Sequence, residues 1–523
     1  MQLSDLFKNG GKKALGAGAA VRMSAEVSAI VVDTRKLVPG CVFVAIRGSR
    51  NDGHTFLADA AAQGAIGIVV DEASAVPANF AGIVHVVPST RQELARLASV
   101  WAGEPSKNLF TVGVTGTNGK TTTTHMIESV LNSGGMPTGV IGTIDHHLGS
   151  RVWPTDMTTP DPMAFQMRLK EFVRLGAKAV ALEASSHALA QSRVDFVEFN
   201  AGIFSNLTRD HLDYHGTMDA YFEAKLRFFT ELLATSSKRE TFAILNGDDE
   251  WAMRARDRIL KLGKSTVWTF ANSIGAPAVA VKAGKVDFSY EITDQGFDGV
   301  KFKLKTPGTT HSISLPMAGL HNVQNAVSAF AVGIAAGLDE RAVAASLYEI
   351  NGVNGRLEHV RNSFGLHIFV DYAHTDDGLI AILKLLNEIR SNAKTRGHES
   401  SAAKIFTVFG CGGDRDRGKR PMMMRAALEG SDTVILTSDN PRNEDPEQIL
   451  DDAMAAVRAD EKSRVQRIVD RRAAIARALE MSRSGDVVLI AGKGHEKTQQ
   501  IGLVKHPFSD VKVATEILES RNA

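Results

Sequence analysis

Disulfide-forming cysteines, long apolar runs and an excess of charge of one sign are all missing from this 523-residue sequence. Its two cysteines, Cys41 and Cys411, cannot build a disulfide framework, and the opening MQLSDLFKNGGKK lacks the apolar core of a signal peptide. No apolar stretch approaches the roughly 18 residues of a membrane span. Lysine and arginine number 60 against 59 acidic residues, which argues against a nucleic-acid sheath or a polybasic anchor. We therefore expect a cytoplasmic protein with no nucleic-acid partner and no membrane span.

Short apolar runs followed by polar turns and helical spacing recur along most of the chain. In residues 1–107 this pattern predicts a small α/β domain. From residue 108 the repeated strand–turn–helix order predicts a parallel sheet with ligands beyond the carboxyl ends of its strands. Period-two runs between residues 278 and 316 predict a small antiparallel insert in this central domain, and residues 352–523 restart the order as a Rossmann-like domain. We thus expect an α/β fold with domains at 1–107, 108–351 and 352–523. The expected strands are CVFVAI, AIGIVV, LFTVGV, AKAVALE, NAGIFSN, TFAILN, LHIFVDY, KIFTVFG, DTVILTS and DVVLIAG.

A glycine-rich turn lies between the first strand and the first helix of the central domain. The stretch VGVTGTNGKTTTTHMI places Gly113, Gly116 and Gly119 ahead of Lys120 and Thr121. Glycines let backbone N–H groups surround phosphate oxygens, a lysine reaches the outer phosphates, and a threonine hydroxyl can ligate magnesium. Val114 stands where the strict P-loop spacing has its first glycine. The alternative to a phosphate-binding loop is a glycine-rich turn that only caps the helix. The predicted ATP-binding residues of this turn are Gly116, Thr117, Asn118, Gly119, Lys120, Thr121 and Thr122.

The motifs after this turn distinguish between classes of nucleotide-binding protein. TGTNGKTT is followed, in order, by LEASSHALAQSRV, SNLTRDHLDYHG and YFEAKLRFF. Together they resemble the Mur ligase family, ATP-dependent enzymes that add amino acids to the peptide of the cell-wall precursor. The resemblance extends over essentially the whole chain. It implies that the N-terminal domain binds UDP, the central domain ATP, and the C-terminal domain the incoming amino acid.

Two potential magnesium ligands follow predicted strands of the central domain. Glu183 ends AKAVALE and His211 follows NAGIFSN, although histidine is less usual than oxygen for so hard a cation. The run His211, Asp213, His215 is also compatible with a zinc cluster. Lys225 alone is an ordinary helix lysine, but the resemblance implies that carbon dioxide carbamylates it and that the carbamate holds a metal ion. The implied catalytic residues are Lys120, Glu183, His211 and Lys225, and the implied metal ligands are Thr121, Glu183, His211 and Lys225 as its carbamate.

The resemblance also implies the residues that bind the two larger substrates. The side chains that bind UDP vary among relatives, and GSRNDG in isolation is typical of an ordinary turn. Met157 stands where some relatives have asparagine, and Asp376 where relatives commonly have proline. The implied residues for UDP-MurNAc-L-Ala-D-Glu are Val32, Thr34, Ser49, Arg50, Asn51, Thr158, Thr159, Ser185, Gln191 and Arg193. The further ATP-binding residues are Asn322, Asn325, Arg356, Asp371 and His374.

An arginine directly follows a predicted strand of the last domain, in TSDNPRNEDP. Arginine binds a carboxylate through two parallel hydrogen bonds, and meso-diaminopimelate differs from lysine by a carboxylate at its far end. Family members that add diaminopimelate resemble this chain in DNPR, which implies that Arg442 selects that substrate. The alternative is a surface ion pair with Glu444 or Asp445, and the basic run in GGDRDRGKRP is also compatible with a solvated face or an RNA patch. The implied diaminopimelate-binding residues are Arg415, Asp439, Asn440, Pro441, Arg442, Gly492 and Glu496.

The implied reaction joins an amine to an activated carboxylate. ATP would phosphorylate the γ-carboxylate of the glutamyl residue, and an amine of meso-diaminopimelate would attack the resulting acyl phosphate. The alternatives are the same ligase adding L-lysine, a folylpolyglutamate-type ligase, and a P-loop switch or binding module without turnover. We expect a monomer that requires ATP and Mg²⁺.

Overall fold

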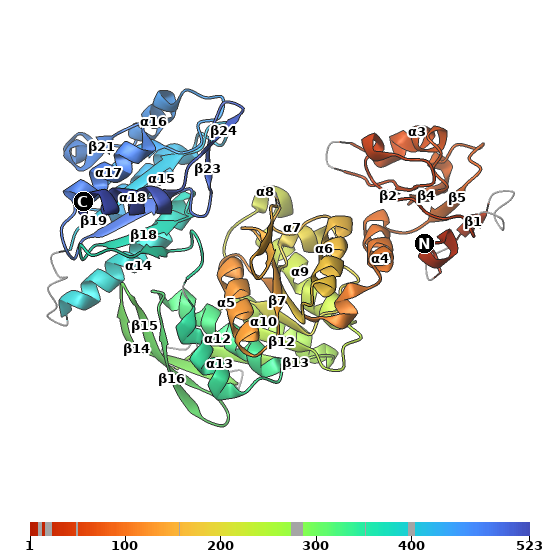
Figure 1. The fold of residues 1–523 in the computed structure, drawn as a ribbon, viewed down its shortest axis with the longest axis horizontal. Helices are drawn as coiled ribbons and strands as arrows, with labels where there is room; N and C mark the ends of the chain where they lie inside the picture. Colours follow the sequence, from red (N-terminus) through yellow and green to blue (C-terminus); the bar gives the residue numbers. More distant parts are fainter. Residues whose placement is uncertain are drawn as a thin grey trace. The chain divides into compact units, whose positions relative to one another are not determined.

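The computed structural model describes residues 1–8, 13–15, 23–48, 51–155, 157–273, 286–350, 352–395 and 403–522 (Figure 1). The chain divides into two compact units. Unit 1 comprises Met1–Tyr290, Lys305–Thr309 and Gln324–Ser346, and unit 2 comprises Glu291–Leu304, Thr310–Val323 and Leu347–Ala523. Across the described ranges, no helix is both long enough and apolar enough to cross a membrane.

The first part of unit 1 is a five-stranded sheet in the order β1-β5-β4-β3-β2. All neighbours are parallel except β1, which is antiparallel to β5. Alternate residues of β3 enter different hydrophobic clusters, Val42 and Val44 one and Phe43 the other, because both faces of a parallel sheet are covered. The strands are β1 (Lys13–Leu15), β2 (Ile30–Val31), β3 (Val42–Val44), β4 (Gly67–Val70) and β5 (Ile83–Val86), and the helices are α1 (Leu3–Leu6), α3 (Leu57–Ala62) and α4 (Thr90–Ala102).

The larger sheet of unit 1 has the order β14-β13-β12-β11-β6-β10-β7-β8-β9. It is parallel from β14 to β7, and β8 and β9 add antiparallel strands at one edge. Strand β6 lies between β10 and β11, and all three are parallel. The loops that leave these three strands therefore meet at one edge of the sheet. The strands are β6 (Phe110–Thr115), β7 (Thr138–Ile141), β8 (His146–Leu148), β9 (Arg151–Trp153), β10 (Ala179–Glu183), β11 (Ala201–Phe204), β12 (Phe242–Asn246), β13 (Thr266–Asn272) and β14 (Phe288–Gly296). The helices are α5 (Lys120–Ser133), α6 (Pro162–Arg174), α7 (Ser186–Ala190), α8 (Leu212–His215), α9 (Met218–Arg227), α10 (Glu250–Leu262), α12 (Leu320–Ala335) and α13 (Glu340–Ser346).

Strands β15 (Gly299–Lys305) and β16 (Thr310–Leu315) follow β14 as a meander. Only two residues connect β14 to β15, and a connection of that length joins antiparallel strands. Buried Val300, Phe302 and Leu304 alternate with exposed residues along β15. The predicted antiparallel pattern is therefore confirmed for β15 and β16, whereas the run VDFSYEI forms β14, which pairs in parallel with β13 and continues the larger sheet. Residues 278–285 lie outside the described residues.

The main sheet of unit 2 has the order β17-β18-β22-β19-β20-β21 and is parallel except for β17. Residues of α14, α15 and α16 pack on the face that carries Phe369 and Phe409, and residues of α17 and α18 on the face that carries Ile368 and Val408. The strands are β17 (Glu358–Val360), β18 (His367–Asp371), β19 (Ile405–Cys411), β20 (Thr433–Ser438), β21 (Val465–Arg467) and β22 (Val487–Ala491), with a separate hairpin of β23 (Thr498–Ile501) and β24 (Val504–Pro507). The helices are α14 (Asp376–Thr395), α15 (Lys419–Gly430), α16 (Pro446–Met454), α17 (Arg471–Met481) and α18 (Asp510–Asn522).

The expected α/β class is confirmed, and each of the ten predicted strand runs contains a strand. The strands of the three main sheets fall within the three predicted sequence ranges. The boundaries at residues 107 and 351 stay predictions.

Candidate active site

The glycine-rich turn leaves the carboxyl end of β6 and enters α5. Gly116 and Gly119 have positive φ angles of 145° and 86°. A Cβ atom on Gly116 would lie 2.0 Å from Ser205 Oγ, and one on Gly119 would lie 2.6 Å from Asn325 Oδ1, so both positions require glycine. Gly113 lies inside β6, where a Cβ would lie 2.5 Å from the Phe228 ring. The interpretation that Gly113 belongs to the turn is therefore wrong, because its role is packing.

Two lysines donate to one carbonyl of this turn. Lys120 Nζ donates to the carbonyl oxygens of Gly116 at 3.0 Å and Thr117 at 2.8 Å, and Lys225 Nζ, from α9, donates to Gly116 at 2.7 Å. Lys225 is 1% exposed, and its Nζ lies 4.5 Å from the centre of the Tyr221 ring. Burial, and then the charge of Lys120, hold the pKa of Lys225 well below its usual value. The surroundings of Lys225 therefore favour the uncharged amine more than those of an exposed lysine do.

Glu183 and the loop with His211 lie at the same edge of the sheet as the turn. Glu183 pairs in register with Val114 of β6, and Phe204 at the end of β11 pairs with Thr115. The buried Glu183 carboxylate accepts hydrogen bonds from Thr143 N at 2.8 Å and Thr143 Oγ1 at 3.0 Å. His211 precedes α8 with a left-handed φ of 52°, and burial lowers its pKa, which favours a neutral imidazole. The carboxylate of Glu183, the hydroxyl of Thr121 and the imidazole of His211 therefore lie at the carboxyl ends of the neighbouring parallel strands β10, β6 and β11.

The structure does not favour a zinc cluster at His211, Asp213 and His215. Within the described ranges, the groups of three metal-binding side chains whose ligand atoms lie within 4.8 Å of one another are elsewhere. The ring of His215 instead has Ser186 Oγ 3.0 Å from its Nε2.

Five of the ten residues implied to bind UDP-MurNAc-L-Ala-D-Glu belong to the central domain, and these five lie in one hydrogen-bonded network. Thr159 Oγ1 donates to the carbonyl of Glu183 at 2.7 Å and lies 3.2 Å from Ser185 Oγ. Arg193 donates to the carbonyl of Thr159 at 2.8 Å and to Gln191 Oε1 at 2.8 Å. Thr158 Oγ1 lies 3.1 Å from the hydroxyl of Thr143, the residue that also holds Glu183. The structure thus links Thr158, Thr159, Ser185, Gln191 and Arg193 to the Glu183 strand end.

Of the further implied ATP-binding residues, Asn322 and Asn325 lie on α12, and Arg356, Asp371 and His374 lie near β18. In unit 1, Asn325 Oδ1 accepts from Thr123 Oγ1 at 3.1 Å, next to Gly119. In unit 2, Asn322 is buried and donates to the carbonyl of Ala318 at 2.8 Å. Asp371 accepts backbone hydrogen bonds from Leu357 and Ala373, and burial raises the pKa of this carboxyl. Arg356 lies over the Tyr372 ring, and exposed His374 has its Nδ1 2.8 Å from the Tyr372 carbonyl.

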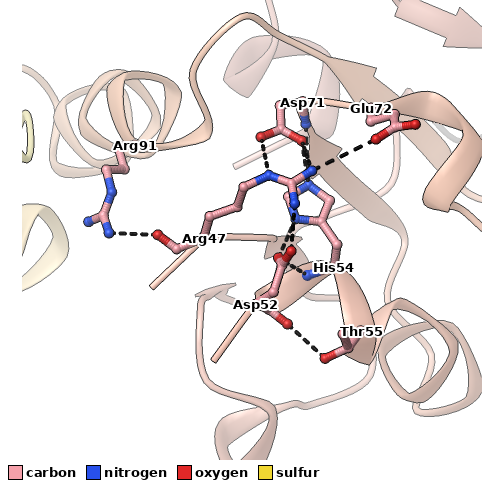
Figure 2. A network of polar contacts seen from close by, with 7 residues as sticks. All are labelled: Arg47, Asp52, His54, Thr55, Asp71, Glu72 and Arg91. Atoms are coloured by element: carbon pink, nitrogen blue, oxygen red, sulfur yellow. Dashed lines mark hydrogen bonds and ion pairs between the residues drawn. The ribbon is translucent and has the colours of Figure 1, made fainter. Parts of the chain in front are cut away.

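The implied UDP loop is anchored by the ion-pair network that Figure 2 shows. Arg47 donates to Asp71 at 2.9 and 3.0 Å and to Asp52 at 2.6 Å, and Asp52 also holds His54. Gly48 N donates to the carbonyl of Asn51 at 2.9 Å, which closes the loop. Ser49 and Arg50 lie outside the described residues. Val32 is exposed, and Thr34 begins a short 3₁₀ helix after β2.

In unit 2, the loops after β20 and β22 form a buried polar cluster. Lys493 is completely buried, and its Nζ donates to Asn440 Oδ1 at 3.0 Å and Glu496 Oε2 at 2.9 Å. Asn440 Nδ2 also donates to Glu496 at 2.9 Å, and Asp439 Oδ1 lies 3.9 Å from Lys493 Nζ. Burial alone would raise the pKa of Glu496, but Lys493 and Asn440 lower it. Gly492 has a φ of 114°, and a Cβ there would lie 2.7 Å from Asp439 Oδ2.

Arg442 is held by its backbone in a strained conformation beside this cluster. Its φ is 52°, its N–H donates to the Gln500 carbonyl at 3.2 Å, and its carbonyl accepts from Gly502 at 2.7 Å. The guanidinium Nη1 donates to the Gly413 carbonyl at 2.6 Å. Strained backbone of this kind gathers at ligand-binding positions.

Glu444 does not form the alternative ion pair that was considered for Arg442. Its carboxylate accepts from Arg420 at 2.8 Å and lies 3.0 Å from an Arg417 nitrogen. Arg420 is 1% exposed, so the basic run is not simply a solvated face, although Arg415 and Arg417 are exposed.

Lys493, Thr143 and Arg47 are three residues of the site that the sequence did not single out. Lys493 stands between two implied ligands, Gly492 and Glu496, and that position was the available signal. Thr143 and Arg47 carried no such signal, because each acts by holding another residue through a fold-dependent contact.

Three family models match the chain along most of its length. They are the Mur ligase family catalytic domain at residues 26–101, the Mur ligase middle domain at 114–333, and the Mur ligase glutamate ligase domain at 355–494. A relative from Geobacter metallireducens is 38% identical over 98% of this chain and 97% of its own length, and one from Chlorobaculum tepidum is 40% identical over 97% and 96%. Both are named UDP-N-acetylmuramoyl-L-alanyl-D-glutamate–2,6-diaminopimelate ligase.

The chain belongs to the Mur ligase family.

Solved structures agree with this assignment. A structure with the same ligase name is 32% identical, with a TM-score of 0.69, and the match covers 100% of this chain and 99% of that chain. MurF from Acinetobacter baumannii is 19% identical with a TM-score of 0.60 over 99% and 98% of the two chains. Folylpolyglutamate synthase from Mycobacterium tuberculosis is 18% identical with a TM-score of 0.57, over 77% of this chain and 92% of that chain. At these identities the last two matches show a shared fold alone.

Proposed function

We propose that this Mur ligase adds meso-diaminopimelate to UDP-MurNAc-L-Ala-D-Glu in the cytoplasm, with ATP converted to ADP and phosphate. The observation that carries the proposal is the near full-length identity to ligases named for that reaction. The γ-carboxylate of the glutamyl residue takes the terminal phosphoryl group of ATP to give an acyl phosphate. The free amine of diaminopimelate attacks the acyl carbon, phosphate leaves with the C–O bonding pair, and the nitrogen releases one proton to solvent as it becomes the amide.

The side chains around the glycine-rich turn fit an Mg²⁺–nucleotide complex. Thr121 and Glu183 offer hard oxygen ligands, and His211 adds an imidazole. The buried amine of Lys225 fits carbamylation, because an uncharged amine attacks CO₂, loses a proton and becomes a carbamate. The carbamate replaces a positive charge beside Lys120 with a negative one that suits a cation. Magnesium supplies charge neutralisation for the phosphoryl transfer, and Lys120 is freed from its carbonyl partners to bind phosphate.

The buried cluster of unit 2 fits the two ends of diaminopimelate. The Arg442 guanidinium offers the planar donor pair that a carboxylate requires, and a lysine substrate would leave it without a carboxylate partner. Glu496 and Asn440 offer acceptors for an ammonium, and Lys493 fixes both of them. We therefore assign Lys493 as a positioning residue rather than a ligand, because its three nearest polar partners are side chains of this cluster.

Mass analysis of the product tests the proposal. The full-length protein is incubated with ATP, Mg²⁺, UDP-MurNAc-L-Ala-D-Glu and an equimolar mixture of meso-diaminopimelate and L-lysine. The expected product has the mass of the diaminopimelate adduct, and one ADP is released for each product molecule. A predominant lysine adduct would refute the assignment of Arg442, and no precursor-dependent ADP release would refute the ligase activity itself.

A further inference from the structure

A group of metal-binding side chains that the proposed reaction does not use joins α5 to β8. His125 and Glu128 lie one turn apart on α5, and His147 lies in β8, the strand that pairs with the edge of the parallel sheet. One ligand atom of each lies within 4.8 Å of the others. His147 Nε2 is 3.0 Å from Glu128 Oε2, and His125 Nδ1 faces the same oxygen at 3.7 Å, too far for a hydrogen bond. Two imidazole nitrogens and a carboxylate oxygen therefore converge on one point.

A second carboxylate orients the strand histidine. Asp145 Oδ1 lies 2.6 Å from His147 Nδ1, on the side of the ring opposite Glu128. Histidines that bind metals almost always donate their other ring N–H to a carboxylate or carbonyl, which fixes the tautomer and the ring. The three converging side chains are only 12–22% exposed, so the point is shielded but still reachable.

We propose that His125, Glu128 and His147 bind one divalent transition-metal ion, such as Zn²⁺, with Asp145 orienting His147. Two imidazoles and one carboxylate, with water in the fourth position, are a tetrahedral zinc ligand set. The two imidazoles favour zinc, cobalt or nickel over magnesium and calcium, which prefer oxygen. The bound ion fastens the helix that begins at Lys120 to the hairpin that leads to Thr158 and Thr159. Its role is structural, and it is separate from the magnesium of the proposed reaction.

The competing explanation is an ion pair without metal. Although burial lowers it, hydrogen bonds to Asp145 and Glu128 raise the pKa of His147 to about 9, so an imidazolium between two carboxylates is a stable arrangement. His125 separates the two explanations. It contributes a ligand atom to the proposed metal site, but its 3.7 Å distance from Glu128 makes it dispensable for the ion pair between His147 and Glu128.

Cobalt binding to the full-length, nucleotide-free protein tests the proposal. After treatment with a chelator, the wild type is titrated with Co²⁺ in excess Mg²⁺, and visible absorption is recorded. We expect one equivalent of Co²⁺ to give the intense absorption of a four-coordinate ion, which Zn²⁺ then displaces. His125→Asn and Glu128→Gln should weaken Co²⁺ binding by ~10-fold or more. His359→Asn should leave it unchanged, because His359 belongs to the other histidine-containing group, with Asp298 and His367.

Thermal denaturation gives a second measurement on the same proteins. Zn²⁺ should raise the Tm of the wild type and of His359→Asn, and should not raise that of His125→Asn. The proposal is overturned if the folded wild type shows no four-coordinate absorption, or if His125→Asn binds Co²⁺ as tightly as the wild type with the same spectrum. The first of these results would leave the ion pair as the explanation of the cluster.

Discussion

Each unit contains a fully buried lysine, and the two lysines have opposite surroundings. Lys225 in unit 1 donates to a backbone carbonyl that it shares with Lys120. Lys493 in unit 2 donates to Asn440 and to the carboxylate of Glu496, with Asp439 nearby. A buried ammonium is stable only when it is paired, and an unpaired one loses its proton. In the proposed function the same side chain therefore supplies a reactive amine in the first site and holds Asn440 and Glu496 in place in the second.

The two sites are also built in different ways. The turn after β6 relies on glycines whose neighbours leave no room for a Cβ, so its shape depends on the backbone. The cluster after β20 and β22 relies on side chains that hold one another. Substitutions should therefore abolish chemistry in the first site and change specificity in the second.

The largest expected effect is on Lys225. Lys225→Ala should lower kcat by ~10³-fold, because the proposed metal ligand and its charge are lost. Precursor-dependent ADP release measures this, and added acetate or formate should restore part of the activity. Lys261→Ala, an exposed lysine of α10, is the matched control and should behave as wild type. Activity of Lys225→Ala within ~3-fold of wild type would rule out the carbamate.

Arg442 should have the next largest effect, on the choice of amino acid. Arg442→Met removes charge-assisted hydrogen bonds worth about 1.5–3 kcal/mol, so the preference for diaminopimelate over L-lysine should fall by ~10–100-fold. Arg442→Lys should recover little of it, because an ammonium lacks the planar donor pair. Competition between the two amino acids measures the ratio, and Arg472→Met, a surface arginine paired with Glu516, is the control. An unchanged ratio would contradict the assignment.

Lys493→Met should raise the KM for diaminopimelate by ~10-fold and leave the KM for ATP unchanged, because Asn440 and Glu496 lose their common donor. A merely structural role would shift both constants or lower the Tm alone. The variant also leaves the partly buried Glu496 carboxylate without its cationic partner, with Asn440 as its remaining donor, which lowers stability. Lys493→Met/Glu496→Gln removes that carboxylate charge, and it should regain stability without regaining affinity for diaminopimelate.

A smaller effect concerns stability and pH. The pKa of Lys225 is lower in the folded than in the unfolded chain, so between the two values the unfolded chain binds more protons. The stability of the unmodified wild type should therefore rise with pH through that window. Lys225→Met lacks this dependence and should melt a few degrees higher near neutral pH in CO₂-free buffer. Parallel Tm–pH curves for the two proteins would contradict the assigned direction.

The smallest effect is expected in the N-terminal network. Arg47→Met should raise the KM for the UDP precursor by no more than ~5-fold, because the Arg47 side chain is half exposed and such ion pairs contribute up to about 1 kcal/mol. Steady-state kinetics with varied precursor measures this. A loss comparable to that of Lys225→Ala would mean that Arg47 contacts the substrate.

Strands that lie in a continuous apolar run could be predicted from the sequence, and strands without such a run could not. β19, β20 and β22 are runs of five to seven buried residues, a pattern typical of parallel strands with both faces covered. β8 and β9 have three residues each, and β7 includes a glycine, so none gave a distinctive run. Gly113 was misassigned because its packing against Phe228 depends on a helix more than 100 residues later in the chain.

The candidate site was partly predictable for a similar reason. The family resemblance supplied residues expected to touch substrates, and the structure links five of them in one network. It could not supply Lys493 or Arg47, because loop residues have no periodicity that separates a buried charge from an exposed one. The burial of a lysine depends on what packs around it.

The carbonyl oxygen of Gly116 accepts from the Nζ groups of Lys120 and Lys225, and both leave it in the proposed cycle, one for phosphate and one on conversion to a carbamate. Its C=O stretch should therefore shift to higher frequency in two steps as CO₂ and then nucleotide bind. With a ¹³C label in the Gly116 carbonyl, infrared spectroscopy would follow the binding of CO₂ and of nucleotide from this one group, with no probe on either substrate.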